Sequence, residues 1–290
     1  MNLPVIDLGA DRTEVLRGLD EAYGRLGFAT IVGHGVPEST VAGVFAASQA
    51  FHALPLERKL AIELDERHRG YIPLGVSTDR TSSVEEATSP NQSESFMSMR
   101  EDAPDSADVV AGTYLAGPNQ WPELDGFRPA VEAYHRAMVG VGRHLVDLIA
   151  ELLDDRDGVL PRAFATPTIW LRLLHYPAPD EADADVGYGS APHRDFGCIT
   201  LLAQDDAGGL EVRSPDGDWL EVQPLPGALV MNVGDMLHRW SNGRLLSTPH
   251  RVVRRPRERY SAAFFFDPHM STVVEPLAGC VDDEHPAAFE

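Results

Sequence analysis

T-I-W-L-R-L-L-H-Y, residues 168–176, opens a series of short β-favouring runs that continues almost to the end of the chain. The later runs are C-I-T-L-L-A (198–203), G-L-E-V-R (209–213), W-L-E-V (219–222), A-L-V-M-N-V (228–233), R-V-V (251–253) and Y-S-A-A-F-F-F (260–266). Turn signals such as P-D-G-D (215–218) and S-N-G (241–243) separate the runs, and no helical stretch is expected between them. The pattern excludes parallel β-α-β winding and predicts an antiparallel sandwich, barrel or jelly roll.

The part of the chain before these runs is mainly helical in its pattern. We expect strands at 5–8 and 28–32, and helices from Asp11 to about Tyr23, over 38–52 and after Pro55. Residues 75–122 are rich in Ser, Thr, Asp, Pro and Gly, and we expect mostly long loops there. One long helix is predicted within 124–154 by an apolar stripe of residues three or four apart, namely Val131, Tyr134, Met138, Val141, Leu145, Leu148 and Leu152.

Composition narrows the class of protein. The chain has 290 residues, of which 43% are hydrophobic and 24% charged, and it contains no long uncharged apolar run. Its first residues, M-N-L-P-V-I-D, have no basic stretch followed by an apolar one, so we expect no secretory signal. Cys198 and Cys280 are far apart and match no zinc or redox spacing. A formal net charge of −21 disfavours binding to nucleic acid. We expect a cytoplasmic protein with neither nucleic acid nor membrane as partner, and the sequence does not indicate an oligomeric state.

The stretch A-P-H-R-D-F-G (191–197) joins two motifs of protein kinases, H-R-D and D-F-G. In a kinase these motifs are separate loops, whereas here a single aspartate would have to serve both. The chain also lacks a G-x-G-x-x-G loop and a V-A-I-K strand upstream. A Ser-His-Asp hydrolase is equally excluded, because no G-x-S-x-G elbow is present. The chemistry of this stretch must therefore be sought elsewhere.

His193 and Asp195 are two residues apart, so on a strand their side chains would point to the same face. With one more imidazole they would form the 2-His-1-carboxylate triad of non-haem Fe(II) oxygenases, which leaves metal positions open for a co-substrate and dioxygen. An H-x-D pair alone would also fit a structural hydrogen-bonded couple. The metal hypothesis depends on a second histidine from a downstream strand, and both His238 and His250 qualify by position.

Arg259 and Ser261 are likewise two apart within an otherwise apolar predicted strand. A guanidinium and a hydroxyl on one face suit a carboxylate, such as the distal end of a dicarboxylate whose other end chelates iron. Arg259 could otherwise be one of several surface arginines in this segment. Its place inside an apolar strand makes that interpretation less convincing.

The chain resembles the 2-oxoglutarate/Fe(II)-dependent oxygenases of the isopenicillin N synthase-like family over most of its length. The matching segments are P-V-I-D-L (4–8), G-F-A-T-I-V-G-H-G-V-P (27–37), R-G-Y-I-P-L-G (69–75), L-R-L-L-H-Y-P (171–177), P-H-R-D-F-G-C-I-T-L-L (192–202), V-M-N-V-G-D-M-L-H-R-W-S-N-G (230–243), S-T-P-H-R-V (247–252) and R-Y-S-A-A-F-F-F-D-P (259–268). Plant relatives often carry N-Y-Y-P where this chain has L-H-Y-P (174–177).

The resemblance implies a mainly β fold with flanking helices, in which a double-stranded β-helix (jelly roll) core carries an N-terminal helical α/β layer. It divides the chain into an N-terminal region with variable loops (1–120), a long support helix (121–160), the catalytic core (165–270) and a C-terminal tail (271–290), integrated in one domain. It implies that iron is bound by His193, Asp195 and His250, and that 2-oxoglutarate is bound by Arg259 and Ser261, with Tyr176 also in contact. His238 lies where the family does not require a histidine, so we expect it to have a structural role.

The implied activity is a dioxygenase that uses Fe(II), 2-oxoglutarate and O2 to oxidise a small molecule, most simply by hydroxylation, with release of succinate and CO2. Two alternatives stay open. One is an iron oxidase of the isopenicillin N synthase type, which needs no 2-oxoglutarate and closes a ring or desaturates its substrate. The other is a non-catalytic jelly-roll binding module. The sequence does not identify the substrate.

Overall fold

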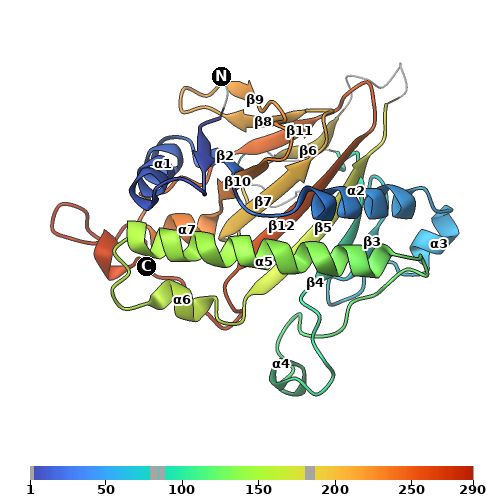
Figure 1. Cartoon of the computed structure of the whole chain (residues 1–290), viewed down its shortest axis with the longest axis horizontal. Helices are drawn as coiled ribbons and strands as arrows, with labels where there is room; N and C mark the ends of the chain where they lie inside the picture. Colours follow the sequence, from blue (N-terminus) through green and yellow to red (C-terminus); the bar gives the residue numbers. More distant parts are fainter. Residues whose placement is uncertain (1–2, 79–83, 85–88, 180–186, 290) are drawn as a thin grey trace.

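We describe the protein from a computed structural model, which covers residues 3–78, 84, 89–179 and 187–289. Two β-sheets form its centre (Figure 1). The larger sheet has eight strands, in the order β1 (Val5–Asp7), β2 (Phe28–Val32), β10 (Leu229–Val233), β7 (Ile199–Gln204), β12 (Arg259–Asp267), β5 (Thr168–Tyr176), β4 (Glu94–Met99) and β3 (Gly70–Ile72). The smaller sheet has four, in the order β6 (Tyr188–His193), β11 (His250–Val253), β8 (Leu210–Arg213) and β9 (Trp219–Glu221). The architecture confirms the predicted double-stranded β-helix with flanking helices.

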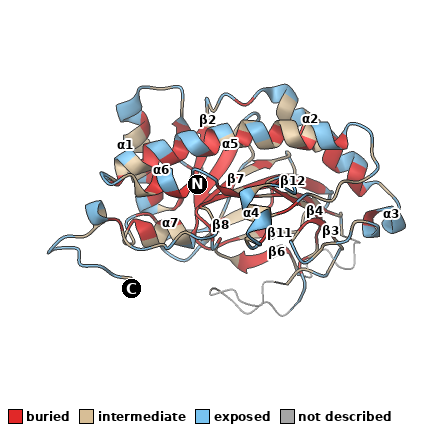
Figure 2. Cartoon of the chain, turned by 90° about the horizontal axis from the view of Figure 1, so that it is seen from below, coloured by how far each residue is buried: buried red, intermediate tan, exposed pale blue. Residues whose placement is uncertain are grey.

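Long helices cover the outer face of the larger sheet. Helix α5 (Phe127–Leu152) runs across it beside α2 (Glu38–His52), and α1 (Arg12–Arg25) packs against the N-terminal strands (Figures 1 and 2). The shorter helices are α3 (Leu56–Leu60), α4 (Ala107–Val110), α6 (Val159–Ala163), α7 (Asp235–Trp240) and the 3-10 turn at Ala278–Cys280. Within the described ranges, no helix has the length and apolar character needed to cross a membrane.

Local sequence signals explain where the helices begin and which way they face. The Asp11 carboxylate accepts the backbone N–H of Thr13 at 2.9 Å and so caps the first turn of α1. Gly126 has a φ of +77° immediately before α5, a conformation that glycine adopts without strain. The helix predicted within 124–154 is confirmed, and its apolar stripe is buried through Val131, Tyr134, Met138, Val141, Leu145 and Leu148.

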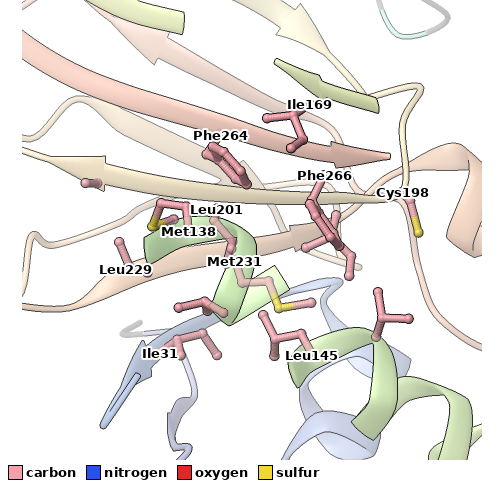
Figure 3. Close-up of a cluster of buried hydrophobic side chains, with 14 of the residues drawn as sticks. Ile31, Met138, Leu145, Ile169, Cys198, Leu201, Leu229, Met231, Phe264 and Phe266 are labelled. Carbon is pink, nitrogen blue, oxygen red and sulfur yellow. The ribbon is translucent and has the colours of Figure 1, made fainter. Parts of the chain in front are cut away.

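Alternation along the central strands creates two cores. Phe264 and Phe266 of β12 belong to the core between the larger sheet and the helices, together with Met138 and Leu145 of α5 (Figure 3). Ala263, which precedes Phe264 in sequence, belongs to a second core enclosed by the two sheets. Successive side chains of a strand point to opposite faces, so the same strands that support the helices also line the space between the sheets.

Two segments differ from the sequence prediction. Residues 94–99 were expected to be loop but form β4, which pairs with β3 and β5. Glu94, Ser95 and Ser98 are buried in this strand, so the apolar alternation that identifies strands is missing. Residues 235–240 form the short helix α7 in a region expected to contain no helix. Six residues are too few to display a helical period.

Candidate metal centre

His193 and His250 face each other across the smaller sheet. His193 is the last residue of β6, His250 is the first of β11, and the antiparallel register makes them direct partners. Their ring centroids are 4.3 Å apart. Asp195 follows His193 by two residues, and its Oδ1 lies 3.7 Å from the Nε2 atom of each histidine. Three side chains from two strands and the following turn therefore converge on one point.

Each imidazole is oriented by a backbone carbonyl of its own chain segment. The Nδ1 atom of His193 is 2.7 Å from the Ala191 carbonyl oxygen, and the Nδ1 atom of His250 is 3.2 Å from that of Thr248. A carbonyl oxygen can only accept, so Nδ1 carries the hydrogen in both rings. In the neutral ring the lone pair is then on Nε2, which is the atom turned toward Asp195.

The Asp195 carboxylate is fixed by two neighbours from the larger sheet. Its Oδ2 accepts the Thr200 hydroxyl at 2.5 Å and the Asn232 side-chain amide at 2.7 Å. Burial by itself would raise the pKa of Asp195, but the two histidines and these two hydrogen bonds outweigh it and the pKa lies below its ordinary value. The carboxylate is therefore ionised, with Oδ1 directed at the histidines.

The donor atoms of His193, Asp195 and His250 all lie within 4.8 Å of one another, close enough to bind one metal ion. Two imidazoles and one carboxylate are the donor set of non-haem Fe(II) sites, and they occupy three positions of an octahedron. His238 is not part of this group. It lies on α7, where its Nδ1 is 2.6 Å from the Leu245 carbonyl oxygen.

The three residues line a cavity of about 80 Å³ between the sheets, which also reaches Arg259, Ser261 and Tyr176. The structure thus brings together all six site residues that the sequence suggested. A larger hollow of about 1010 Å³ lies between α1 and residues 214–220, but the described residues that line it include no histidine or cysteine. The donor chemistry, and not the volume, distinguishes the smaller cavity.

Arg259 is a buried cation at one end of this cavity, with 2% of its surface exposed. Its guanidinium donates to Ser261 Oγ at 3.2 Å and to Gln204 Oε1 at 3.3 Å, and it lies 4.7 Å from the centre of the Tyr176 ring. Within the described ranges its Nε has no hydrogen-bond partner and no carboxylate lies within 4.0 Å of it. An uncompensated buried charge is unfavourable, so this end of the cavity suits an anion.

The residues that support these groups were not predicted from the sequence. Thr200, Asn232 and Gln204 lie on strands β7 and β10, most of them far in sequence from the residues they contact. The sequence contained one indication of such a residue, because the polar Asn232 interrupts the apolar run V-M-N-V. Leu174, where plant relatives often carry Asn, lines the cavity with an apolar side chain.

Known proteins share both the sequence and the fold. The profile of the 2OG-Fe(II) oxygenase superfamily matches residues 170–268, and the profile "non-haem dioxygenase in morphine synthesis N-terminal" matches residues 3–124. Over 281 residues the chain is 35% identical to a 2-oxoglutarate-Fe(II) type oxidoreductase of Emericella nidulans, covering 94% of this chain and 79% of that one. It is 33% identical to a homoarginine-6-hydroxylase of Arabidopsis thaliana, covering 92% and 80%.

Two solved structures have the same architecture throughout. A full-length Neurospora crassa protein in complex with alpha-KG (2-oxoglutarate) matches with a TM-score of 0.85 at 28% identity, over 99% of this chain and 92% of that chain. A 2OG-Fe(II) oxygenase family protein from Caulobacter crescentus matches with a TM-score of 0.85 at 31% identity, over 98% and 93%.

Proposed function

The chain belongs to the 2OG-Fe(II) oxygenase superfamily, and from this membership we propose that His193, Asp195 and His250 bind its Fe(II). The protein is a 2-oxoglutarate/Fe(II)-dependent dioxygenase, an oxidoreductase that uses Fe(II), 2-oxoglutarate and O2. Bound iron supplies the redox chemistry by which 2-oxoglutarate and O2 give succinate and CO2 while a small molecule is oxidised. Three protein ligands suit this task because they leave positions open on the metal.

The residues around the proposed ligands hold them ready for the ion. In the neutral rings, the contacts of Nδ1 with the carbonyls of Ala191 and Thr248 leave the lone pair on Nε2, the atom that would bind the metal. Thr200 and Asn232 occupy Oδ2 of Asp195, so that Oδ1 is the oxygen presented to the ion. Both arrangements reduce the reorganisation needed on binding.

We assign the distal carboxylate of 2-oxoglutarate to Arg259 and Ser261. The observation that carries this assignment is a buried guanidinium, without a described carboxylate partner, in the cavity that the three proposed ligands also line. The guanidinium fork matches a carboxylate and gives charge-assisted hydrogen bonds. Ser261 adds a hydroxyl, while Gln204 and the Tyr176 ring hold the guanidinium in place.

Hydroxylation is the outcome that we propose for the substrate. It is the simplest oxidation that this cofactor set supports, and a homoarginine-6-hydroxylase is among the relatives. If a substrate is converted under ¹⁸O2, the product should gain one labelled oxygen atom. A product lacking the label and two hydrogens would indicate desaturation or ring closure instead.

The free thiols of Cys198 and Cys280 support a reducing compartment such as the cytoplasm.

Succinate formation and O2 uptake test the proposed roles directly. We expect purified protein with Fe(II) to convert 2-oxoglutarate to succinate, slowly without substrate, and His250→Ala to abolish this turnover. His238→Ala is the matched control, since that histidine lies outside the proposed site. Turnover that survives His250→Ala would refute the ligand assignment.

Undiminished O2 uptake without 2-oxoglutarate would point to the oxidase alternative. A protein that binds neither Fe(II) nor 2-oxoglutarate would point to the binding module.

A further inference from the structure

His175 lies on the opposite face of the larger sheet from the carboxylate site proposed at Arg259. Tyr176 of β5 pairs with Arg259 of β12, and the next pair in the register joins His175 to Tyr260. Neighbouring residues of a strand point to opposite faces. The Tyr176–Arg259 pair therefore lines the cavity, whereas the second pair faces helix α2, where both of its rings lie near His52.

His175 contacts the residues on both sides of Arg259 in sequence. Its ring is stacked on that of Tyr260, with centroids 4.6 Å apart and an angle of 12° between the planes. Its Nε2 lies 3.2 Å from Glu258 Oε2, and the Tyr260 hydroxyl donates to the same oxygen at 3.1 Å. Glu258 immediately precedes β12, so its contact with His175 ties the incoming chain to β5. Arg259, the first residue of β12, is thus held at both of its chain neighbours.

The other nitrogen of His175 is fixed by a buried carboxylate. Its Nδ1 is 2.8 Å from Glu94 Oε1, and the Glu94 side chain is 7% exposed. Lys59 Nζ donates to Glu94 Oε2 at 2.7 Å, and the Tyr71 hydroxyl donates to the same oxygen. Burial alone would raise the pKa of Glu94, but its three hydrogen-bond donors lower it from 4.5 to about 2. The ring therefore has a fixed anion on this side.

The two carboxylate contacts depend on the protonation of His175. An ionised carboxylate can only accept hydrogen bonds, so both contacts are made only when the ring has a hydrogen on each nitrogen. A neutral ring has one hydrogen. The contact with Glu94 is the shorter and the more buried of the two, since the Glu258 side chain is 61% exposed. Loss of one proton from His175 should therefore release Glu258.

Other ionisable groups near the ring come from helices α2 and α3 and from β12. The ring of His52 lies 5.4 Å from that of His175, and burial lowers the pKa of His52 to about 4, so it is neutral at neutral pH. Burial raises the pKa of the Tyr260 phenol, which therefore keeps its hydrogen. Lys59 of α3 is held in the buried ion pair described above. A pH effect that depends on Glu258 near neutral pH would therefore have His175 as its source.

We propose that His175 is a positioning residue for 2-oxoglutarate, which holds the backbone of Arg259 through Glu258 and Tyr260 and does so fully only when its ring is protonated. Without the contact between His175 and Glu258, the end of β12 must be ordered when the ligand binds, and this cost weakens binding. The inference rests on the proposed function, because it assumes that Arg259 binds 2-oxoglutarate. It goes further, since it makes co-substrate binding depend on a residue outside the cavity.

Glu258→Ala tests this role at an exposed residue, where the substitution should leave the protein folded. We would titrate 2-oxoglutarate without oxygen into protein that holds Fe(II), and we expect the variant to bind about three- to fivefold more weakly at about pH 6, since a largely exposed charged contact is worth up to about fivefold. Glu258→Gln should keep part of the affinity, because its amide oxygen still accepts a hydrogen bond. Asp206→Ala is the matched control, since it removes the exposed ion pair with Arg257 and leaves His175 untouched.

The pH profile separates positioning from a general structural role. The advantage of the wild-type protein over Glu258→Ala should disappear between about pH 6 and about pH 9, because only the protonated ring of His175 holds Glu258. Protonation of the proposed iron ligands affects both proteins alike and cancels in the ratio of their dissociation constants. His175→Phe keeps a ring to stack on Tyr260 and should show the same loss at about pH 6; if it does not fold, Glu258→Ala supplies the comparison.

The assignment is overturned if Glu258→Ala binds 2-oxoglutarate as tightly as the wild-type protein at about pH 6, if the ratio does not fall as the pH rises, or if Asp206→Ala weakens binding as much. Failure of the proposed function would look different, because 2-oxoglutarate would then not bind, or would bind independently of Arg259.

Discussion

Replacing Arg259 with Met removes the cation proposed to hold 2-oxoglutarate while keeping an unbranched side chain of similar length. In the structure this guanidinium is 2% exposed and offers a fork to the cavity. A carboxylate placed on the fork would accept two charge-assisted hydrogen bonds, each worth about 1.5–3 kcal/mol. We expect the variant to lose about 3–5 kcal/mol of binding free energy, which weakens the affinity for 2-oxoglutarate about 10²- to 10⁴-fold.

The same substitution should have little effect on the protein without ligand. No described carboxylate pairs with Arg259, so its removal breaks no ion pair and leaves no buried anion behind. The loss is limited to the contact with the Tyr176 ring and the hydrogen bonds to Ser261 and Gln204, about 1–2 kcal/mol. Breaking a buried ion pair would instead cost about 3–5 kcal/mol.

Calorimetric titration with 2-oxoglutarate and thermal denaturation measure both quantities. In the wild-type protein, ligand at about 100 times its dissociation constant adds about 2.7 kcal/mol of stability, and this increment should vanish in Arg259→Met. Arg251→Met is a matched control, because Arg251 lies on β11 and pairs with Glu211 at 2.7 Å outside the cavity. Affinity for 2-oxoglutarate within about threefold of wild type in Arg259→Met would refute the assignment.

Three other buried groups give measurable expectations. His250→Ala should weaken Fe(II) binding at least about 100-fold while His238→Ala leaves it unchanged, and equal affinities in an anaerobic titration would contradict the ligand assignment. Lys59 donates to Glu94 at 2.7 Å with side chains 8% and 7% exposed, so Glu94→Gln should lower the free energy of unfolding in urea by about 3–5 kcal/mol. A loss below about 1 kcal/mol would show that the pair contributes little. Burial lowers the pKa of His52 from 6.5 to about 4, so between these two pH values the unfolded chain binds more protons than the folded one. The free energy of unfolding should therefore decrease by about 3 kcal/mol as the pH falls from 6.5 to 4. His52→Gln should flatten this part of the pH profile, and an unchanged slope would count against the shifted pKa.

The sequence predicted the fold wherever burial follows a simple period. Strand β12 and helix α5 are apolar on a regular face, and both were expected close to their observed bounds. Strand β4 was not predicted because its buried positions on both faces include Glu94, Ser95 and Ser98, whose partners come from distant segments. Polar side chains that are satisfied only in the folded state resemble loop residues in the sequence. The proposed region boundaries at 120, 160 and 270 stay predictions.

The site was predictable to the extent that its geometry is local. A two-residue spacing places His193 beside Asp195 whatever the rest of the chain does. The choice between His238 and His250 needed the family resemblance, because sequence spacing does not fix which downstream strand pairs with β6. The roles of Thr200 and Asn232 could not be predicted for the same reason, because only the register of β7 and β10 brings these two residues together.

The two carbonyls that orient the histidines have a consequence for how the enzyme acquires its metal. Each carbonyl stands two residues before its histidine, Ala191 before His193 and Thr248 before His250, so each ring direction is set by a contact within its own chain segment. We expect the histidine rings to be ordered in the metal-free protein, so that loading or exchange of the ion requires no unfolding. Ions with similar ligand preferences, such as Mn(II) and Co(II), should compete for the site on the basis of affinity and abundance. We therefore expect the supply of ions in the cell to contribute, together with affinity, to which metal occupies the enzyme.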